Sequence, residues 1–251
     1  MGTMKILAEG LSPAQERVMS ILEYKKIKII ERKDIVAIIK EYVAVKDIQD
    51  LIEKLQKKKR IIPLKKGVYA VVPLSSINMG PLLSEFETID YLLKENYYIG
   101  LYNAFNLHGF TEQIPIKIFV FNTKYSGDKE ILQFRIKFFK IKEDKLFGID
   151  NQKYPYSDKE RTILDVLEYP QYLGGLNEVL DRVKEEGYNK NKLVDYAIRY
   201  DSIKVMKLVG LLTNSQKLYS FLLKKGTLKY YTSLKKTGTK LLDKRWKIRL
   251  I

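Results

Sequence analysis

Apolar residues recur at helical spacing twice in succession between residues 31 and 72. The first run covers residues 35–42 and the second covers residues 48–55, and each places isoleucine, leucine, valine or tyrosine on one side of a helix. Each run therefore predicts an amphipathic helix with one buried face. The short connection between them predicts a helix–turn–helix pair whose axes cross steeply.

Two short strands are predicted directly after this pair, at residues 60–64 and 68–72. Gly67 in the turn between them supplies the positive φ that a tight hairpin needs. Pro63 cannot donate to a neighbouring strand, so it restricts its own strand to a sheet edge. An N-capping serine followed by proline, Ser12-Pro13, begins a third helix. The order of these elements predicts a winged helix–turn–helix.

The second helix of the pair has a polar face, which a winged helix–turn–helix places in the major groove of DNA. Lys46, Asp50, Glu53 and Lys57 lie opposite the apolar stripe, with Gln49 and Arg60 on its flank. Lysine and arginine favour guanine and glutamine favours adenine, whereas carboxylates repel phosphate but can accept from cytosine N4. A solvated helix in a helical bundle is the alternative. The predicted DNA contacts are Arg32, Lys33, Lys46, Gln49, Lys57, Arg60, Lys65 and Lys66.

The net charge of +16 is distributed unevenly. Residues 1–73 carry +7, residues 74–181 carry −4 and residues 182–251 carry +13. An anionic polymer that touches both ends fits this distribution, and an acidic protein is the competing partner. Basic residues are interleaved with aromatic residues from residue 217 onward, as on surfaces that follow a phosphate backbone, although the aromatic residues could equally be core. Candidate secondary contacts with DNA or a partner are Lys235, Lys236, Lys240, Lys244, Arg245 and Lys247.

We predict two domains, residues 1–78 and residues 79–251, in an α+β fold. The second is a larger mixed domain with a basic helical C-terminal part and a candidate sub-boundary near residue 186. Its predicted helices are residues 82–95, 101–107, 157–167, 176–186, 192–200, 203–212 and 216–225, and its predicted strands are residues 117–121, 131–141, 146–149 and 244–251. A loop is predicted at residues 125–129 and a turn at residues 142–145.

The sequence offers little for catalysis, and we predict no catalytic residue, metal site or cofactor. It has no cysteine and one histidine, His108, which argues against zinc and against disulfides. His108 precedes Gly109 at the end of a predicted helix, where a capping or packing role is expected. Asp128, Glu143 and Lys145 have the loose pattern of a metal-dependent nuclease, but the last two fall in a predicted turn. No glycine-rich phosphate-binding motif occurs.

The apolar runs are too short to span a membrane, and the first residues do not have the pattern of a secretory leader. We therefore expect a cytoplasmic protein that makes no contact with a membrane. The sequence does not fix the oligomeric state, and monomers that bind cooperatively to DNA repeats are one arrangement that fits.

Several short segments occur in an order seen in one known family. They are Gly67-Val68-Tyr69, the block LHGFTEQIP from Leu107 to Pro115, Tyr156-Ser157 with Glu160-Arg161-Thr162-Ile163-Leu164-Asp165, Gly174-Gly175, and Gly238 with Lys244-Arg245-Trp246. Together they resemble the AbiEi antitoxins, regulators of type IV toxin–antitoxin operons, over nearly the whole chain. The prolines common before the family's terminal glycine are not found here. The resemblance implies a repressor of its own operon that counters a nucleotidyltransferase-like toxin without forming a stable complex.

The sequence therefore predicts a DNA-binding transcriptional repressor that acts as an antitoxin, with double-stranded operator DNA as its partner. One alternative is an antitoxin that sequesters its toxin directly through the basic C-terminal part. The other is a metal-dependent nuclease, which requires Asp128, Glu143 and Lys145 to converge.

Overall fold

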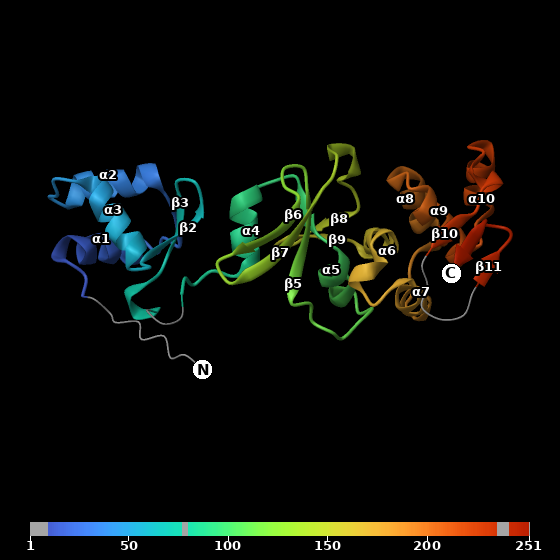
Figure 1. The fold of residues 1–251 in the computed structure, drawn as a ribbon, viewed down its shortest axis with the longest axis horizontal. Coiled ribbons are helices and arrows are strands. Elements are labelled where there is room, and N and C mark those ends of the chain that lie inside the picture. Colours follow the sequence, from blue (N-terminus) through green and yellow to red (C-terminus); the bar gives the residue numbers. More distant parts are fainter. Residues whose placement is uncertain (1–9, 77–79, 235–240, 251) are drawn as a thin grey trace. The chain divides into compact units, whose positions relative to one another are not determined.

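The computed structural model describes residues 10–76, 80–234 and 241–250, and the chain forms two compact units, residues 1–88 and 89–251 (Figure 1). The described residues form ten α-helices and three sheets, so the mixed α+β class is confirmed. The predicted boundary between residues 78 and 79 lies outside the described residues. The units divide within α4 (Glu85–Leu93). Among the described helices, none combines the length and the apolar character that crossing a membrane requires.

The first unit packs three helices against a three-stranded antiparallel sheet of order β1-β3-β2 (Figure 1). Strand β2 is an edge strand, as Pro63 predicted. Ser12 and Gln15 form a reciprocal capping box at the start of α1. The elements are α1 (Pro13–Tyr24), β1 (Ile29–Glu31), α2 (Arg32–Tyr42), α3 (Ile48–Lys57), β2 (Ile61–Lys65), β3 (Val68–Val71) and the 3-10 turn η1 (Leu74–Ser76). The core of the unit includes Val18, Leu22, Ile35, Ile39, Ile52 and Leu55.

The second unit is built on a six-stranded mixed sheet of order β6-β7-β5-β4-β9-β8. Its strands are β4 (Tyr97–Ile99), β5 (Lys117–Asn122), β6 (Gly127–Ile131), β7 (Phe134–Lys140), β8 (Ile149–Asn151) and β9 (Pro155–Ser157). The loop predicted at residues 125–129 is wrong, because most of that segment belongs to β6. The strand predicted at residues 131–141 divides into β6 and β7 at Leu132, which has a positive φ of 57°. The predicted turn at residues 142–145 is the 3-10 turn η2 (Glu143–Lys145).

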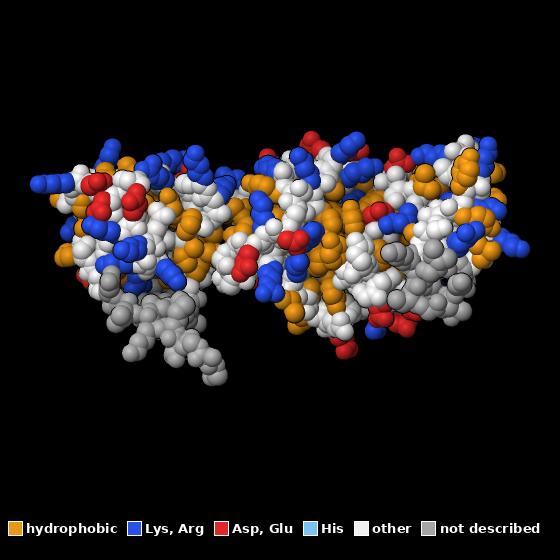
Figure 2. All heavy atoms as spheres, viewed as in Figure 1, with side chains coloured by type: hydrophobic (Ala, Val, Ile, Leu, Met, Phe, Trp, Pro, Cys, Tyr) orange, Lys and Arg blue, Asp and Glu red, His pale blue; other side chains and the backbone are white. Residues whose placement is uncertain are grey.

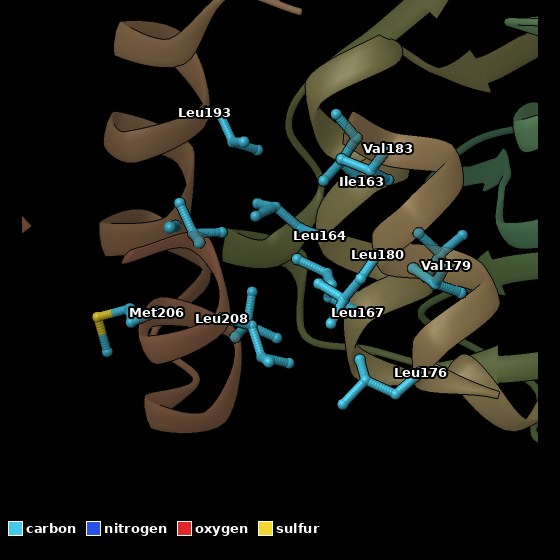
Figure 3. Packing of buried hydrophobic residues seen from close by; sticks show 14 of the residues in the cluster. Ile163, Leu164, Leu167, Leu176, Val179, Leu180, Val183, Leu193, Met206 and Leu208 are labelled. Atoms are coloured by element: carbon cyan, nitrogen blue, oxygen red, sulfur yellow. The ribbon is translucent and has the colours of Figure 1, made fainter. Parts of the chain in front are cut away.

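Helix α6 is the centre of the second unit and is buried from Glu160 to Leu167. Figure 3 shows residues of α7 packed on one side of it and residues from the α8–α9 pair on the other. Val183 and Leu193 belong to the same core cluster, so the candidate sub-boundary near residue 186 falls inside one hydrophobic core. The helices are α5 (Leu101–Leu107), α6 (Lys159–Glu168), α7 (Leu176–Glu185), α8 (Lys190–Tyr200), α9 (Ile203–Thr213) and α10 (Gln216–Lys224), with 3-10 turns η3 (Pro170–Tyr172) and η4 (Thr227–Lys229).

An ion pair is buried on α6. The Nε of Arg161 donates to Asp165 at 3.2 Å, and the hydroxyl of Tyr98 donates to the same carboxylate at 3.0 Å. The guanidinium lies over the rings of Tyr98, Phe147 and Tyr200, with centroid distances of 5.2, 4.4 and 4.7 Å. Burial raises the pKa of Asp165 to about 6, and Arg161 opposes that rise. The pair therefore joins α6 to three segments that are distant in sequence.

The C-terminal segment forms a small sheet of order β10-β12-β11, with β10 (Thr232–Leu234), β11 (Leu241–Asp243) and β12 (Ile248–Leu250). It is attached to α9 at two positions one turn apart. The ammonium of Lys207, which is almost fully buried, donates to the carbonyl of Tyr230 at 2.7 Å and to the hydroxyl of Thr232 at 2.9 Å. Gly210 faces the ring of the buried Trp246. The closing strand predicted at residues 244–251 is shorter, because residues 244–247 form the turn before β12.

Candidate nucleic-acid interface

Helix α3 has one buried and one exposed face, as its pattern predicted. Leu51, Ile52 and Leu55 are buried, whereas Gln49, Asp50, Glu53 and Lys57 are exposed. Asp47 caps the helix, because its side chain accepts from the backbone N–H of Asp50 at 3.0 Å. Lys46 is exposed but lies before this cap, so it extends from the loop that precedes the helix rather than from the helical face.

The hairpin turn and the start of α2 are joined through Arg32. The backbone N–H of Arg32 donates to the carbonyl of Gly67 at 2.8 Å, and Gly67 has the positive φ, 73°, that its glycine predicted. Lys65 and Lys66 are exposed beside it. The side chain of Arg32 extends in turn to α3, where its guanidinium donates to the side-chain oxygen of Gln49. Arg32 therefore connects the hairpin turn with the exposed face of α3.

A continuous chain of hydrogen bonds crosses this face. Arg32 donates to Gln49, and the amide nitrogen of Gln49 donates to the carboxylate of Glu53. All three side chains are exposed. We refer to these three residues as the reading chain. It brings together one predicted contact of α2, one predicted contact of α3 and a carboxylate that, by its sequence position, repels phosphate but can accept from cytosine N4.

Two further ion pairs lie near the reading chain. Lys54 pairs with Asp50 at 2.7 Å and Lys33 pairs with Glu31 at 3.0 Å. Both lysines are more than half exposed, so each pair contributes little to stability and can exchange for a phosphate. Figure 2 shows lysine and arginine side chains across the visible face of the first unit with acidic side chains between them. The predicted contacts Lys33, Lys57 and Lys66 are all exposed.

Arg60 is the exception among the predicted DNA contacts. Only 9% of its surface is exposed, and its guanidinium donates to the carbonyl of Pro73 at 3.4 Å. It follows the C-terminus of α3, where the chain turns back into β2 and covers the side chain. Arg60 therefore connects the start of β2 to the segment that follows β3. It does not belong to the exposed residues that could contact DNA.

The basic C-terminal segment is partly core and partly surface. Trp246 is buried, whereas Lys244 and Arg245 are exposed in the turn before β12. Arg245 donates to Gln216 at 3.0 Å and lies over the ring of Tyr219 on α10. Lys247 is half-buried, with its ammonium 5.0 Å from the ring centroid of Tyr231. Residues Lys235, Lys236, Gly238 and Lys240 lie outside the described residues.

Two of the three residues of the nuclease hypothesis, Asp128 and Lys145, are tied to different partners. The carboxylate of Asp128, on β6, pairs with Lys117 and Lys137 at 2.7 Å each. Lys145 instead donates to the last carbonyls of α8, at Arg199 and Tyr200. Within the described ranges, no group of three His, Cys, Asp or Glu side chains could hold a metal ion. Asp128 and Lys145 are therefore held by separate elements of the second unit.

His108 serves as the C-cap of α5, the kind of role that its position predicted. Its Nε2–H donates to the carbonyl of Ser157 at 2.8 Å, so the ring links the end of α5 to β9.

A shallow pocket of about 270 Å³ lies in the second unit, beside the segment LHGFTEQIP. Tyr102, Thr111 and Gln113 contribute polar groups to it, together with Arg182. The guanidinium of Arg182 pairs with Glu178 at 2.9 Å, and the hydroxyl of Tyr102 donates to Gln113. Its polar side chains therefore bond largely to one another.

Sequence reasoning missed three arrangements. The four-residue spacing of Gln49 and Glu53 is visible in the sequence, but the participation of Arg32 depends on how α2 meets the hairpin. The pair Arg161 and Asp165 has the same spacing as many solvent-exposed pairs, and nothing local marks it as buried. Lys207 likewise appeared to be one of many lysines on a basic helix.

No protein-family model matches the chain, and no curated protein matches it. Among solved structures, the chain is similar to the crystal structure of the RV2827C protein from Mycobacterium tuberculosis. The TM-score is 0.69 at 11% sequence identity, over 96% of this chain and 92% of that chain. At this identity the similarity concerns the fold alone, and it supports the α+β architecture along nearly the full length.

Proposed function

We propose that this protein is a sequence-specific DNA-binding transcriptional repressor whose first unit is a winged helix–turn–helix. Helix α3 would enter the major groove, and the turn between β2 and β3 would follow the adjacent backbone. The contacts are Arg32, Lys33, Lys46, Gln49, Lys57, Lys65 and Lys66. The observation that carries the proposal is the position of Arg32, which joins the hairpin turn to the exposed face of α3 through Gly67 and Gln49.

The resemblance of several segments to the AbiEi antitoxins extends the proposal to autoregulation of a type IV toxin–antitoxin operon. In that role the second unit would counter a nucleotidyltransferase-like toxin without a stable complex. A stable complex on co-purification with the toxin would instead favour direct sequestration, the alternative for which the basic C-terminal part offers a surface.

Replacing Lys46 and Gln49 together with alanine is expected to abolish the preference for operator DNA. One phosphate or guanine contact and one adenine contact would be lost, each worth about tenfold in discrimination. Fluorescence anisotropy on the protein's own upstream DNA against a scrambled duplex measures the effect. Both residues are exposed, so the fold is retained. Equal binding of the two duplexes by the unsubstituted protein would refute the repressor function.

Replacing Lys244 and Arg245 with alanine tests the secondary contacts. Loss of two phosphate contacts is expected to reduce the slope of log K against log salt by about 1.8. A truncation is a poor test, because it removes the buried Trp246 from the core. The matched control replaces Lys184 and Arg182 on α7, which changes the charge equally. An equal decrease of the salt slope in both double variants would assign the effect to net charge rather than to direct contact with DNA.

A further inference from the structure

The reading chain uses the same atoms that its side chains would need to recognise bases. The side-chain oxygen of Gln49 accepts from Arg32, and its amide nitrogen donates to Glu53. A glutamine that reads adenine needs both atoms at once, one for N6 and one for N7. Without DNA, Gln49 therefore has both of these atoms occupied by its neighbours.

The hydrogen bonds of the reading chain can be replaced by contacts with DNA at little cost in free energy. Arg32, Gln49 and Glu53 are all exposed, and hydrogen bonds between exposed groups contribute little because water replaces them. When Gln49 turns to a base, Arg32 becomes available to a phosphate or guanine. The carboxylate of Glu53 then faces the groove, where it needs a hydrogen-bond donor.

The two acidic residues on the exposed face differ in their partners. Asp50 pairs with the ammonium of Lys54 at 2.7 Å, so its charge is compensated in the free protein. Glu53 is bound by the neutral amide of Gln49. Removing that amide to read a base leaves a full negative charge among phosphates. Cytosine and adenine both present an amino group in the major groove, but only the N4 amino group of cytosine has no acceptor of the same base beside it, so cytosine is the base from which a carboxylate best accepts a hydrogen bond.

We infer that Glu53 sets the base preference of α3 by accepting a hydrogen bond from cytosine N4 next to the base that Gln49 reads. This inference rests on the proposed function. At a site with guanine or thymine in that position, the carboxylate meets acceptors or a methyl group, and at adenine it meets the N7 acceptor beside the N6 amino group, so binding is weaker. The residue that opposes phosphate binding is then the one that rejects wrong sequences, which is how specificity against competing sites is commonly built.

The test is selection from a library of random 20-base-pair duplexes with the full chain and with Glu53→Gln. The unsubstituted protein is expected to enrich a motif with cytosine at one position. Glu53→Gln is expected to lose that preference by roughly tenfold and to favour adenine there, because an amide pairs with adenine in two hydrogen bonds. The exposed position of Glu53 means that this variant folds.

Glu16→Gln is the matched control, because it removes the same charge from an exposed position on α1. It is expected to enrich the same motif as the unsubstituted protein. If Glu53→Gln also enriches that motif with unchanged base ratios, the role of Glu53 is overturned while the proposed function stands. If the unsubstituted protein enriches no motif, the proposed function fails and this inference fails with it.

Discussion

Asp165→Asn is expected to destabilise the second unit by about 3–5 kcal/mol. The substitution leaves the guanidinium of Arg161, only 1% exposed, without its compensating charge. Arginine does not lose its proton inside proteins, so the charge remains buried. Arg161→Met is expected to be less severe, because burial already raises the pKa of Asp165 to about 6 and the carboxyl can take up a proton. Urea unfolding followed by circular dichroism measures the free energy of unfolding of both variants.

The double variant Arg161→Met/Asp165→Asn removes both charges and is expected to be more stable than Asp165→Asn alone. A matched control is the exposed pair of Arg182 and Glu178, which has the same four-residue spacing and a similar distance of 2.9 Å. Arg182→Met is expected to leave the unfolding curve unchanged within experimental error, because solvent screens an exposed pair. Equal effects of Arg182→Met and Asp165→Asn would contradict the assigned importance of burial.

The contrast between these two pairs shows where sequence reasoning stops. Both are arginine–carboxylate pairs on helices, and the sequence predicted both helices. What differs is that Tyr98, Phe147 and Tyr200 arrive over Arg161 from three distant segments. Local periodicity reports which face of a helix is apolar, but it carries no information about a helix that is covered on every side.

Strand β6 shows a related limit. Residues 127–130 read Gly-Asp-Lys-Glu and are exposed, so no alternation of apolar residues marks them as a strand. The strand exists because its backbone pairs with β7 from Gly127 to Ile131. Helix α5, in contrast, has the bounds that were predicted, because Gly100 and Gly109 flank a short apolar run. Elements defined by local signals were predicted, and an element defined by its neighbour was missed.

In the candidate interface, too, some features could be predicted from local signals and others could not. The exposed face of α3 follows from its apolar stripe, so the exposure of Gln49, Glu53 and Lys57 could be predicted. The burial of Arg60 could not, because it depends on the path of the chain into β2 and on the carbonyl of Pro73. The connection of Arg32 to Gly67 likewise requires the register of the hairpin. Sequence predicts which side chains are available, and the fold determines which of them lie together.

Gly210→Ala is expected to destabilise the second unit by about 2–4 kcal/mol, although alanine favours helices. A Cβ at position 210 would overlap the ring atoms Cε3 and Cζ3 of Trp246, which real contacts do not allow. Either α9 or the turn that carries Trp246 must move. Trp246 is the single tryptophan of the chain, so its fluorescence reports the change directly. A shift of the emission to longer wavelength is expected, together with a lower urea midpoint.

The sign of the stability change caused by Gly210→Ala distinguishes the contact with Trp246 from a general disturbance of α9. In a Trp246→Ala background the clash is gone, and Gly210→Ala is expected to stabilise by up to about 1 kcal/mol through helix propensity alone. Circular dichroism follows these variants, which have no tryptophan. Gly187→Ala, where a Cβ meets nothing within 4 Å, is the matched control and should leave the emission unchanged. If Gly210→Ala were destabilising in both backgrounds, α9 itself and not its contact with Trp246 would require the glycine.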